Sequence, residues 1–334
     1  MARLSGTSLF LSFHALLPLL IAVHTGAAQM AVSPEGNLPQ VTPWTAQDVQ
    51  HAYGLPGTKP KAKGTLAVNT DSITFMGKSG ISTIPRRSVM AVSTSDERVE
   101  LWGTKGNLLR MAIPYGGGEA AAGVMHHKVG MLTVEFIDQQ GGYHGAVFFL
   151  PVDEAERVLT SFSQMPTVQH EPSSEACQNS SRDPQSVLVA TPTWDQAEVP
   201  AAYRALVYEH LIDRLQRVEH MDHVYRDGEN DGQARCPQYI IHISIAGFKQ
   251  GSQVKRAVMG PVGMFVGTTQ MTFDETITDV SAGLNEKEQV KATVRGGSES
   301  ATVPDRVAKR LAKHYSAARK KFDKRGVAVS TNKS

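Results

Sequence analysis

Four residues that can bind a metal ion or transfer a proton lie within five positions of the chain: Glu219, His220, Asp222 and His223. Imidazole and carboxylate side chains are common zinc ligands and general acids or bases. If this segment is a strand, His220 and Asp222 face one side and Glu219 and His223 the other, because side chains alternate along a strand. The four converge only if the segment is a turn. We therefore favour a solvated strand edge over a metal or catalytic site.

A second group of histidines consists of His126, His127 and His144. The first two lie in a glycine-rich insertion, and the third lies in the hairpin that follows it. A metal site made from these three requires the insertion to fold back over a sheet, and local polar packing is the simpler interpretation. We predict neither a metal nor another cofactor, and keep the two histidine groups as candidates.

The motifs that usually mark an active site are missing from the sequence. It contains no HExxH, CxxC, GxxxxGK[S/T] or GxSxG pattern, which argues against zinc protease, thiol redox, phosphate-loop and α/β-hydrolase chemistry. Residues 116–121 match GxGxxA, but no crossover helix and parallel strand follow them, so they are interpreted as part of a flexible insertion. We favour a protein that is not an enzyme.

The charges of the chain are balanced in number but unevenly placed. There are 34 basic and 32 acidic side chains among 334 residues, and this net charge of +2 indicates no nucleic-acid partner. Residues 306–325 nevertheless hold nine lysines or arginines and one aspartate, so the remainder of the chain carries a net negative charge. Apolar residues recur through the same stretch at helical spacing, which predicts an amphipathic helix.

This basic helix has two interpretations. It can lie on anionic lipid or on a polyanionic cell-wall polymer, or it can dock by its apolar face and leave a solvated basic side. We favour the second interpretation. The basic residues expected at the surface are Lys309, Arg310, Lys313, Arg319, Lys320 and Lys321.

The N-terminus has the order of a secretory signal. Arg3 precedes an apolar run over residues 9–23, and the small residues 26–28 follow. The run is shorter than the roughly 20 apolar residues of a membrane helix, so we predict a signal peptide over residues 1–28 that is cleaved near Ala28. An uncleaved anchor is the alternative. The protein is then periplasmic or secreted, without a membrane span once the signal is removed.

Export changes how the two cysteines are interpreted. In an oxidising compartment Cys177 and Cys236 can form one disulfide. On the chain-entropy description such a bridge stabilises the fold by about 4 kcal/mol. The alternative is two unpaired thiols.

The first half of the chain contains a β-rich pattern. Residues 29–60 hold five prolines and few apolar residues in register, which predicts a disordered leader. From residue 64, short β-like runs over 66–68, 73–75, 81–84, 89–92 and 99–102 are separated by turn signals at the spacing of an antiparallel meander. Alternation over residues 132–136 and 147–150 predicts a hairpin, and a helical pattern over 153–162 follows. We predict a β domain over residues 64–163.

This order of about seven strands and one C-terminal helix resembles that of pleckstrin-homology (PH) and GRAM domains. Residues 64–68, the aromatic run 72–75 and the proline-marked run 84–89 resemble the opening of a GRAM domain. The resemblance implies a PH/GRAM-like β-barrel or sandwich with a C-terminal helix. The glycine-rich insertion 103–130 departs from the family pattern. Eukaryotic members often bind phosphoinositides, lipids that an exported domain would not meet.

The second half of the chain has a different pattern. Residues 164–185 are polar and typical of a linker. A short strand over 187–190, a helix opened by Pro200, further strands and a closing helix from residue 304 follow. Tyr239, Ile241 and Ile243 alternate with other residues, which indicates a strand with one apolar face. We predict an α+β sandwich over residues 186–325, with helices on one face of a mainly antiparallel sheet, and a disordered tail over 326–334.

The second pattern resembles the α/β domains of exported bacterial envelope proteins, such as the curli-secretion lipoprotein and the N-terminal domain of the Tol-system translocation protein. The resemblance rests on the element order over 186–324, the start at 187–189, and the strand of 239–245 followed by a glycine-rich break. The lipidated cysteine and pore-forming hairpins of the curli protein have no counterpart in this sequence, so its secretion activity is not implied.

The signal segment and the missing catalytic motifs favour an exported, non-enzymatic binding or assembly module of the bacterial cell envelope. Its partner would be another envelope protein or an anionic envelope surface. One alternative is a periplasmic metal-dependent hydrolase that uses the histidine groups. Another is a peripheral protein that binds anionic lipid through the basic helix.

Overall fold

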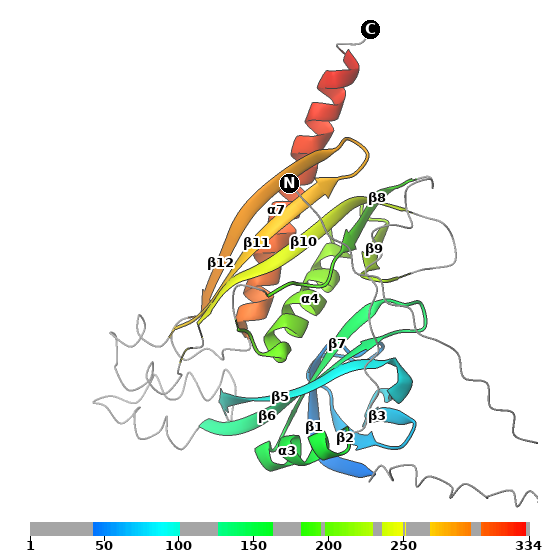
Figure 1. The fold of residues 1–334 in the computed structure, drawn as a ribbon, viewed down its shortest axis with the longest axis vertical. Helices are drawn as coiled ribbons and strands as arrows, with labels where there is room; N and C mark the ends of the chain where they lie inside the picture. The colour runs from blue at the N-terminus through cyan, green and yellow to red at the C-terminus, as the bar shows by residue number, and fades with distance from the viewer. Residues whose placement is uncertain are drawn as a thin grey trace, which may run out of the picture. The chain divides into compact units, whose positions relative to one another are not determined.

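The computed structural model describes residues 43–100, 126–162, 182–194, 198–229, 236–249, 251, 268–294 and 302–331. These residues form two β-sheets, of seven and five strands, with helices packed on them (Figure 1). Both sheets belong to one compact unit, residues 41–334. The α+β class predicted from the sequence is therefore confirmed.

The first sheet is antiparallel throughout. Its strand order is β4-β3-β2-β1-β7-β6-β5, so β4 and β5 are edge strands and the described residues form no closed barrel. Helix α3 (Val152–Thr160) follows the last strand and packs on β6 and β5. The strands are β1 (Trp44–Tyr53), β2 (Lys63–Val68), β3 (Ser72–Gly77), β4 (Gly80–Pro85), β5 (Val89–Glu100), β6 (His126–Ile137) and β7 (Tyr143–Leu150), and the 3-10 turn η1 (Arg86–Ser88) joins β4 to β5.

The predicted meander and hairpin are present with changed boundaries. The first three runs correspond to β2, β3 and β4, and the hairpin corresponds to β6 and β7. Two short strands predicted near residues 89–92 and 99–102 are instead one long strand, β5. The polar residues between them keep their pairing with β6 and so continue the ladder.

The predicted disordered leader over residues 29–60 is wrong for residues 44–53, which form β1 in the middle of the first sheet. A bulge between Ala46 and Val49, with Asp48 at a φ of 55°, interrupts the period-two pattern that marks a strand. The third buried position of β1 is a histidine, His51, so the apolar signal is weak. Residues 29–42 lie outside the described part of the chain.

The second sheet is mixed rather than mainly antiparallel. Its order is β12-β11-β10-β8-β9, in which the β10–β8 and β8–β9 pairs are parallel and the other two pairs are antiparallel. The β8–β9 pair is parallel because α4 connects the two strands as a crossover helix. The elements are β8 (Arg182–Val189), α4 (Ala201–Leu215), β9 (His223–Arg226), β10 (Cys236–Lys249), β11 (Thr269–Asp279), β12 (Leu284–Val294) and α7 (Val303–Thr331).

Two predicted boundaries in this half are wrong. Strand β8 begins at Arg182, so the end of the predicted linker (164–185) belongs to the sheet; Gln185, at a φ of 64°, breaks the alternation there. Helix α7 continues to Thr331, so the predicted disordered tail (326–334) begins inside a helix. A single glycine, Gly326, costs a helix only about 1 kcal/mol relative to alanine and does not end it.

Helices α4 and α7 contact each other and lie on one face of the second sheet (Figure 1). Helix α4 also contacts β5, β6 and β7 of the first sheet. The core around it therefore includes Tyr143 and Val147 from β7 as well as Ile241 and Ile243 from β10. The two predicted domains share this apolar core, and α4 lies within it.

Candidate functional site

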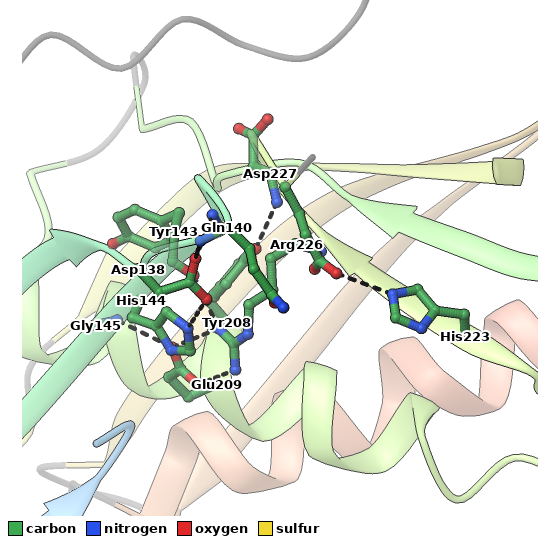
Figure 2. A network of polar contacts seen from close by, with 12 residues as sticks. Asp138, Gln140, Tyr143, His144, Gly145, Tyr208, Glu209, His223, Arg226 and Asp227 are labelled. Carbon is green, nitrogen blue, oxygen red and sulfur yellow. Dashed lines mark hydrogen bonds and ion pairs between the residues drawn. The ribbon is translucent and has the colours of Figure 1, made fainter. Parts of the chain in front are cut away.

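A network of buried polar residues lies where α4, β7 and β9 meet (Figure 2). Its centre is Glu209 of α4, which is 4% exposed. The carboxylate of Glu209 accepts the backbone N–H of Gly145 at 3.0 Å. Its two oxygens accept Nη1 and Nη2 of Arg226 at 2.9 and 2.8 Å. This fork geometry is the strongest form of a carboxylate–arginine pair.

Arg226 connects β9 to both α4 and the first sheet. Its Nη1 also donates to the Tyr143 carbonyl at 2.9 Å, and its guanidinium lies 5.7 Å from the ring centre of Tyr208. Burial opposes the charge of Arg226, but attraction to Glu209 outweighs burial and raises the pKa of Arg226. The backbone N–H of Tyr143 donates to the Asp227 carbonyl at 2.9 Å, so β7 is also bonded to the end of β9 through the main chain.

The segments after β8 and β9 are joined through Tyr208 and Asp227. The Tyr208 hydroxyl accepts the Asp227 N–H at 3.0 Å and donates to the Val189 carbonyl at 3.3 Å. The Asp227 carboxylate accepts the N–H and the hydroxyl of Thr191 at 3.0 and 2.8 Å. Burial raises the pKa of Tyr208 well above its usual value, so the hydroxyl keeps its proton.

The turn between β6 and β7 contributes Asp138 and His144. Asp138 accepts the backbone N–H groups of Gln140 and Gly142 at 2.8 and 2.9 Å, and its other oxygen lies 3.0 Å from His144 Nε2. Burial alone would raise the pKa of Asp138, but the hydrogen bonds from His144 and the two amides outweigh burial and lower it. His144 Nδ1 lies 3.6 Å from the Glu209 carboxylate, so the imidazole stands between two carboxylates.

Two glycines allow these elements to approach closely. A Cβ atom on Gly145 would lie 2.5 Å from the Cβ of Ala205 on α4. Gly141, at a φ of 85°, would place a Cβ 2.5 Å from the carbonyl oxygen of Gly228. A larger residue at either position would push the β6–β7 hairpin away from α4 or from the turn after β9.

The loop between β1 and β2 is held in place by His51, which is 1% exposed. Its Nε2 accepts the Leu55 N–H at 3.0 Å, so Nδ1 carries the proton and donates to the Lys59 carbonyl at 3.1 Å. Burial lowers the pKa of His51, which favours the neutral ring that this pattern requires. The loop is therefore fixed to the sheet from which it projects.

This loop lines two hollows in the surface. The larger has a volume of about 540 Å³ and is also lined by β4 and the end of β6, including Ile81 and Asp138. The smaller has a volume of about 220 Å³ and is also lined by His144, Glu209 and Arg226. Asp138 and His144 are bonded to each other, so the same network supports both hollows.

The network is better suited to joining the elements than to catalysis. A general base must have an oxygen or nitrogen free to reach a substrate proton. Both oxygens of Glu209 are already engaged by N–H groups of Arg226, and one also by Gly145. Over the residues that the structure describes, no three His, Cys, Asp or Glu side chains gather as a group that can hold a metal ion.

The residues clustered around His220 do not form one site. Glu219 and His220 lie in the turn after α4, where their side chains pair at 3.3 Å and are both exposed. His223 is the first residue of β9, and its Nε2 lies 3.0 Å from the Glu229 carboxylate. The segment is indeed a turn at His220, but the two histidines have different acidic partners.

The second histidine group is also separated. His126 and His127 begin β6, whereas His144 lies opposite Phe136 near the other end of that strand. Phe136 is nine positions along the strand from His127, which corresponds to about 30 Å at 3.3 Å per residue. Of this group, His144 is drawn in the network of Figure 2.

The basic closing helix docks by its apolar face, as the favoured interpretation expects. Leu311, Tyr315 and Phe322 are buried. Of the six predicted surface residues, Arg319 is half-buried and the others are exposed; these are Lys309, Arg310, Lys313, Lys320 and Lys321. No helix in the described part of the chain is both long and apolar enough to cross a membrane.

The predicted disulfide stays a prediction. Cys236 is buried at the start of β10, and Cys177 lies outside the described residues. The predicted signal peptide, residues 1–28, also lies outside them.

Sequence reasoning missed Glu209, Arg226 and His51. The available signal for Glu209 is its position among the apolar residues of α4, between Leu206 and Leu211, where an unpaired carboxylate is costly. Its partner is 17 positions away on a different element, and nothing in the spacing connects the two. His51 was not identified because its strand, β1, was predicted to be disordered.

The sequence matches no known family and none of the curated proteins compared with it. Among solved structures, a variant of the PelC dodecamer from Paraburkholderia phytofirmans is 15% identical with a TM-score of 0.27, over 38% of this chain and 82% of that chain. A second PelC dodecamer from that organism is 12% identical with a TM-score of 0.28, over 38% and 84%. Hypothetical protein CT253 from Chlamydia trachomatis is 11% identical with a TM-score of 0.26, over 40% and 94%. Similarities this weak indicate no function.

Proposed function

We propose that the protein is an exported, non-enzymatic binding or assembly module of the cell envelope. We further propose that it binds an extended segment of another envelope protein in the groove beside β4. The observation that carries this proposal is the groove itself, which has a volume of about 540 Å³ and adjoins a strand at the edge of its sheet.

The groove lies at the seam of a sheet that does not close. Residues 79–85, which include β4, line it, and so do residues 136–139 at the end of β6. Four strands separate β4 from β6 in the sheet order, so two distant parts of the sheet approach each other here without pairing. A strand placed in the seam can pair with the backbone N–H and C=O groups of β4 that face away from β3.

Apolar side chains beside the seam favour a partner segment that is itself partly apolar. Ile81 and Met76 lie opposite each other in the β3–β4 ladder, and their exposed fractions are 71% and 42%. Leu55 and Phe136 also line the groove. Adjacent exposed hydrophobic residues at a strand edge indicate an interaction site more strongly than hydrophobic residues scattered singly over a surface.

The walls of the groove are held in place before any partner arrives. Asp138 lines the groove and is fixed by His144 and two backbone amides. His51 fixes the loop that contributes Leu55 and its neighbours. A site with ordered walls loses less entropy on binding, which favours affinity for a short segment.

The PH/GRAM-like description of the first sheet is retained as part of this proposal. Seven antiparallel strands followed by α3 agree with the expected element order. The open seam then becomes the distinguishing feature, because it leaves β4 available to a partner strand.

Selection of peptides tests the groove. Random peptides displayed on phage and selected on the purified protein are expected to converge on segments with alternating apolar residues. A synthetic peptide of the selected sequence should slow hydrogen exchange of the β4 amides. Ile81→Asp puts a charge beside the seam and is expected to weaken binding of that peptide at least about tenfold, measured by fluorescence anisotropy.

Trp194→Gln is the matched control, because it removes another large exposed side chain, 43% exposed, that does not line the groove. Peptide affinity should be unchanged in this variant. If selection enriches no peptide, or if Ile81→Asp binds the selected peptide as tightly as the wild type does, the groove is not the binding site.

Intact mass and cell fraction test export. The full chain expressed in a bacterial host is expected in the periplasmic fraction with a mature form that begins at Gln29. Its mass should be lower by two hydrogens than that of the reduced protein, because Cys177 and Cys236 would be bonded. Full-length protein in the soluble cytoplasmic fraction would show that the export proposal is wrong.

A further inference from the structure

The cationic residues of α7 are divided between two roles. The arginines of the basic stretch are used to attach the helix. Arg306 and Arg310 donate to the backbone carbonyls of Thr293 and Lys291 on the edge strand β12. Arg319 donates to the Glu219 carbonyl at 3.2 Å, and Arg325 pairs with Glu286.

Most lysines of the same stretch are left for solvent. Lys321 shares Glu286 with Arg325, at 3.2 Å. The other four lysines are exposed and have no hydrogen bond or ion pair within the described chain; they are Lys309, Lys313, Lys320 and Lys324. We refer to these four as the lysine row.

The lysine row lies on a single face of the helix. At 100° per residue its members fall within about 60° of one another, and they extend over about 22 Å of the helix axis. The apolar residues that dock α7, such as Leu311 and Tyr315, point about 170° away from the row. Attachment of the helix therefore holds the row outward.

Few of the described acidic side chains near α7 are placed to neutralise the row. The two aspartates of the helix, Asp305 and Asp323, lie at the side of the row rather than within it. Glu286 forms ion pairs with Lys321 and Arg325, which lie on the helix outside the lysine row. The basic stretch carries eight net positive charges and the rest of the chain six net negative charges, so positive charge is concentrated in this helix.

We propose that the lysine row docks the protein on the surface of an anionic lipid membrane. The potential of such a surface extends only about one Debye length, about 10 Å at 0.1 M salt. A straight, outward-facing row can enter this layer along its whole length while the acidic remainder of the chain stays outside it. The row thus determines which face of the protein meets the membrane.

The chemistry of the row favours headgroups as the partner. Lysine is a compact, hydrated charge on a flexible stem and makes diffuse contacts, whereas arginine forms the forked bonds of specific anion recognition. In this helix the arginines of the basic stretch bond to groups of the same chain. Between Lys313 and Lys320 this side of the helix carries Ser316 and Ala317, which are too small to insert between acyl chains. Binding is then electrostatic and superficial.

This inference goes beyond the proposed groove, since the lysine row and the groove share no residue. The membrane would orient the module, and the groove would receive the protein partner. Failure of one proposal leaves the other standing, because the tests use different variants and different probes.

Vesicle sedimentation tests the row. The protein, in the form recovered from cells, is expected to sediment with vesicles of two parts phosphatidylcholine to one part phosphatidylglycerol, and not with pure phosphatidylcholine. Binding should disappear in 1 M salt, where the Debye length is about 3 Å. Each lysine contributes about fivefold, so K309Q/K313Q/K320Q/K324Q should lower the partition coefficient by on the order of 100-fold or more.

A second quadruple variant, K63Q/K78Q/K249Q/K287Q, is the matched control. It removes the same charge from four exposed lysines outside α7 and should keep most of the binding. Circular dichroism checks that both variants are folded. No sedimentation of the wild type at low salt, equal losses in the two variants, or binding to soluble polyphosphate without binding to vesicles would each overturn the membrane proposal.

Discussion

Replacing Arg226 with methionine is expected to lower the free energy of unfolding by about 3–5 kcal/mol. The substitution leaves Glu209, which is 4% exposed, as a buried carboxylate without its forked partner. It also removes the donor to the Tyr143 carbonyl. Whole domains are stable by only about 5–15 kcal/mol, so the expected loss is a large fraction of the total. Urea unfolding followed by tryptophan fluorescence measures it.

A double variant shows whether the loss comes from the stranded charge. Glu209→Leu/Arg226→Met buries no charge and should be more stable than Arg226→Met alone, because a buried pair replaced by apolar residues is often nearly neutral. Arg217→Met is the matched control: Arg217 lies just after the last residue of α4 and pairs with Asp213 of that helix, and its side chain is 69% exposed. This control should lose less than about 1 kcal/mol. Equal losses in Arg226→Met and Arg217→Met would show that the network does not hold the two sheets together.

Elements with a regular apolar period were predicted well from the sequence. Strand β10 alternates from Tyr239 to Ile245, and α7 repeats Leu311, Tyr315 and Phe322 at helical spacing. Each pattern corresponds to a buried face in the structure. The period is legible because one continuous face of each element packs on a single core.

Strand β1 could not be predicted in the same way. Its ladder contains a bulge at Asp48, and one of its inward positions is His51, whose burial depends on two backbone partners in the following loop. A polar residue becomes a core residue only when those partners are in place. Local composition carries no information about them.

The candidate site was missed for a related reason. His220 and His223 are close in the sequence, which suggested a shared site, yet they have separate partners. The residues that do meet, Glu209 and Arg226, come from α4 and β9 and are brought together by the parallel crossover. The sheet was predicted to be mainly antiparallel, and the sequence does not show that β8 and β9 pair in parallel. The error in topology and the missed site therefore have the same origin.

The sequence also did not show which basic residues of α7 attach the helix and which face solvent. In the structure, Arg306 and Arg310 reach the carbonyls of β12, whereas the lysines beside them do not. Those carbonyls are accessible because β12 is an edge strand. The sequence predicts a basic helix, and only the sheet order shows which of its charges remain available.

A second buried pair, Glu275 and His314, is expected to make stability depend on pH. Glu275 of β11 is 1% exposed beneath α7, and its carboxylate lies 2.7 Å from His314 Nδ1. Burial raises the pKa of Glu275 to about 7, although the hydrogen bond to His314 opposes this shift. The same hydrogen bond raises the pKa of His314 above its usual 6.5. Both groups therefore bind protons more tightly in the folded protein than in the unfolded chain.

Tighter proton binding by the folded state means that stability falls as the pH rises. The contribution of Glu275 is complete below about pH 4.5, its ordinary pKa, and is lost as the pH passes 7. That of His314 is complete below pH 6.5 and is lost as the pH rises through its raised pKa. The pair should therefore cost the protein about 2–3 kcal/mol of stability between pH 5 and pH 8.

Glu275→Gln removes the titrating carboxyl and the cause of the raised pKa of His314 together. The wild type is expected to lose about 2–3 kcal/mol of its free energy of unfolding between pH 5 and pH 8, and this variant is expected not to show that loss. Urea unfolding at each pH measures the difference. Glu288→Gln is the matched control, since Glu288 contacts the other side of the His314 ring at 3.3 Å but is 55% exposed. Its profile should follow that of the wild type closely, because solvent screens its charge. Parallel profiles for the wild type and Glu275→Gln would show that the Glu275–His314 pair does not control the pH dependence of stability. The pair would then bind protons equally tightly in the folded protein and in the unfolded chain.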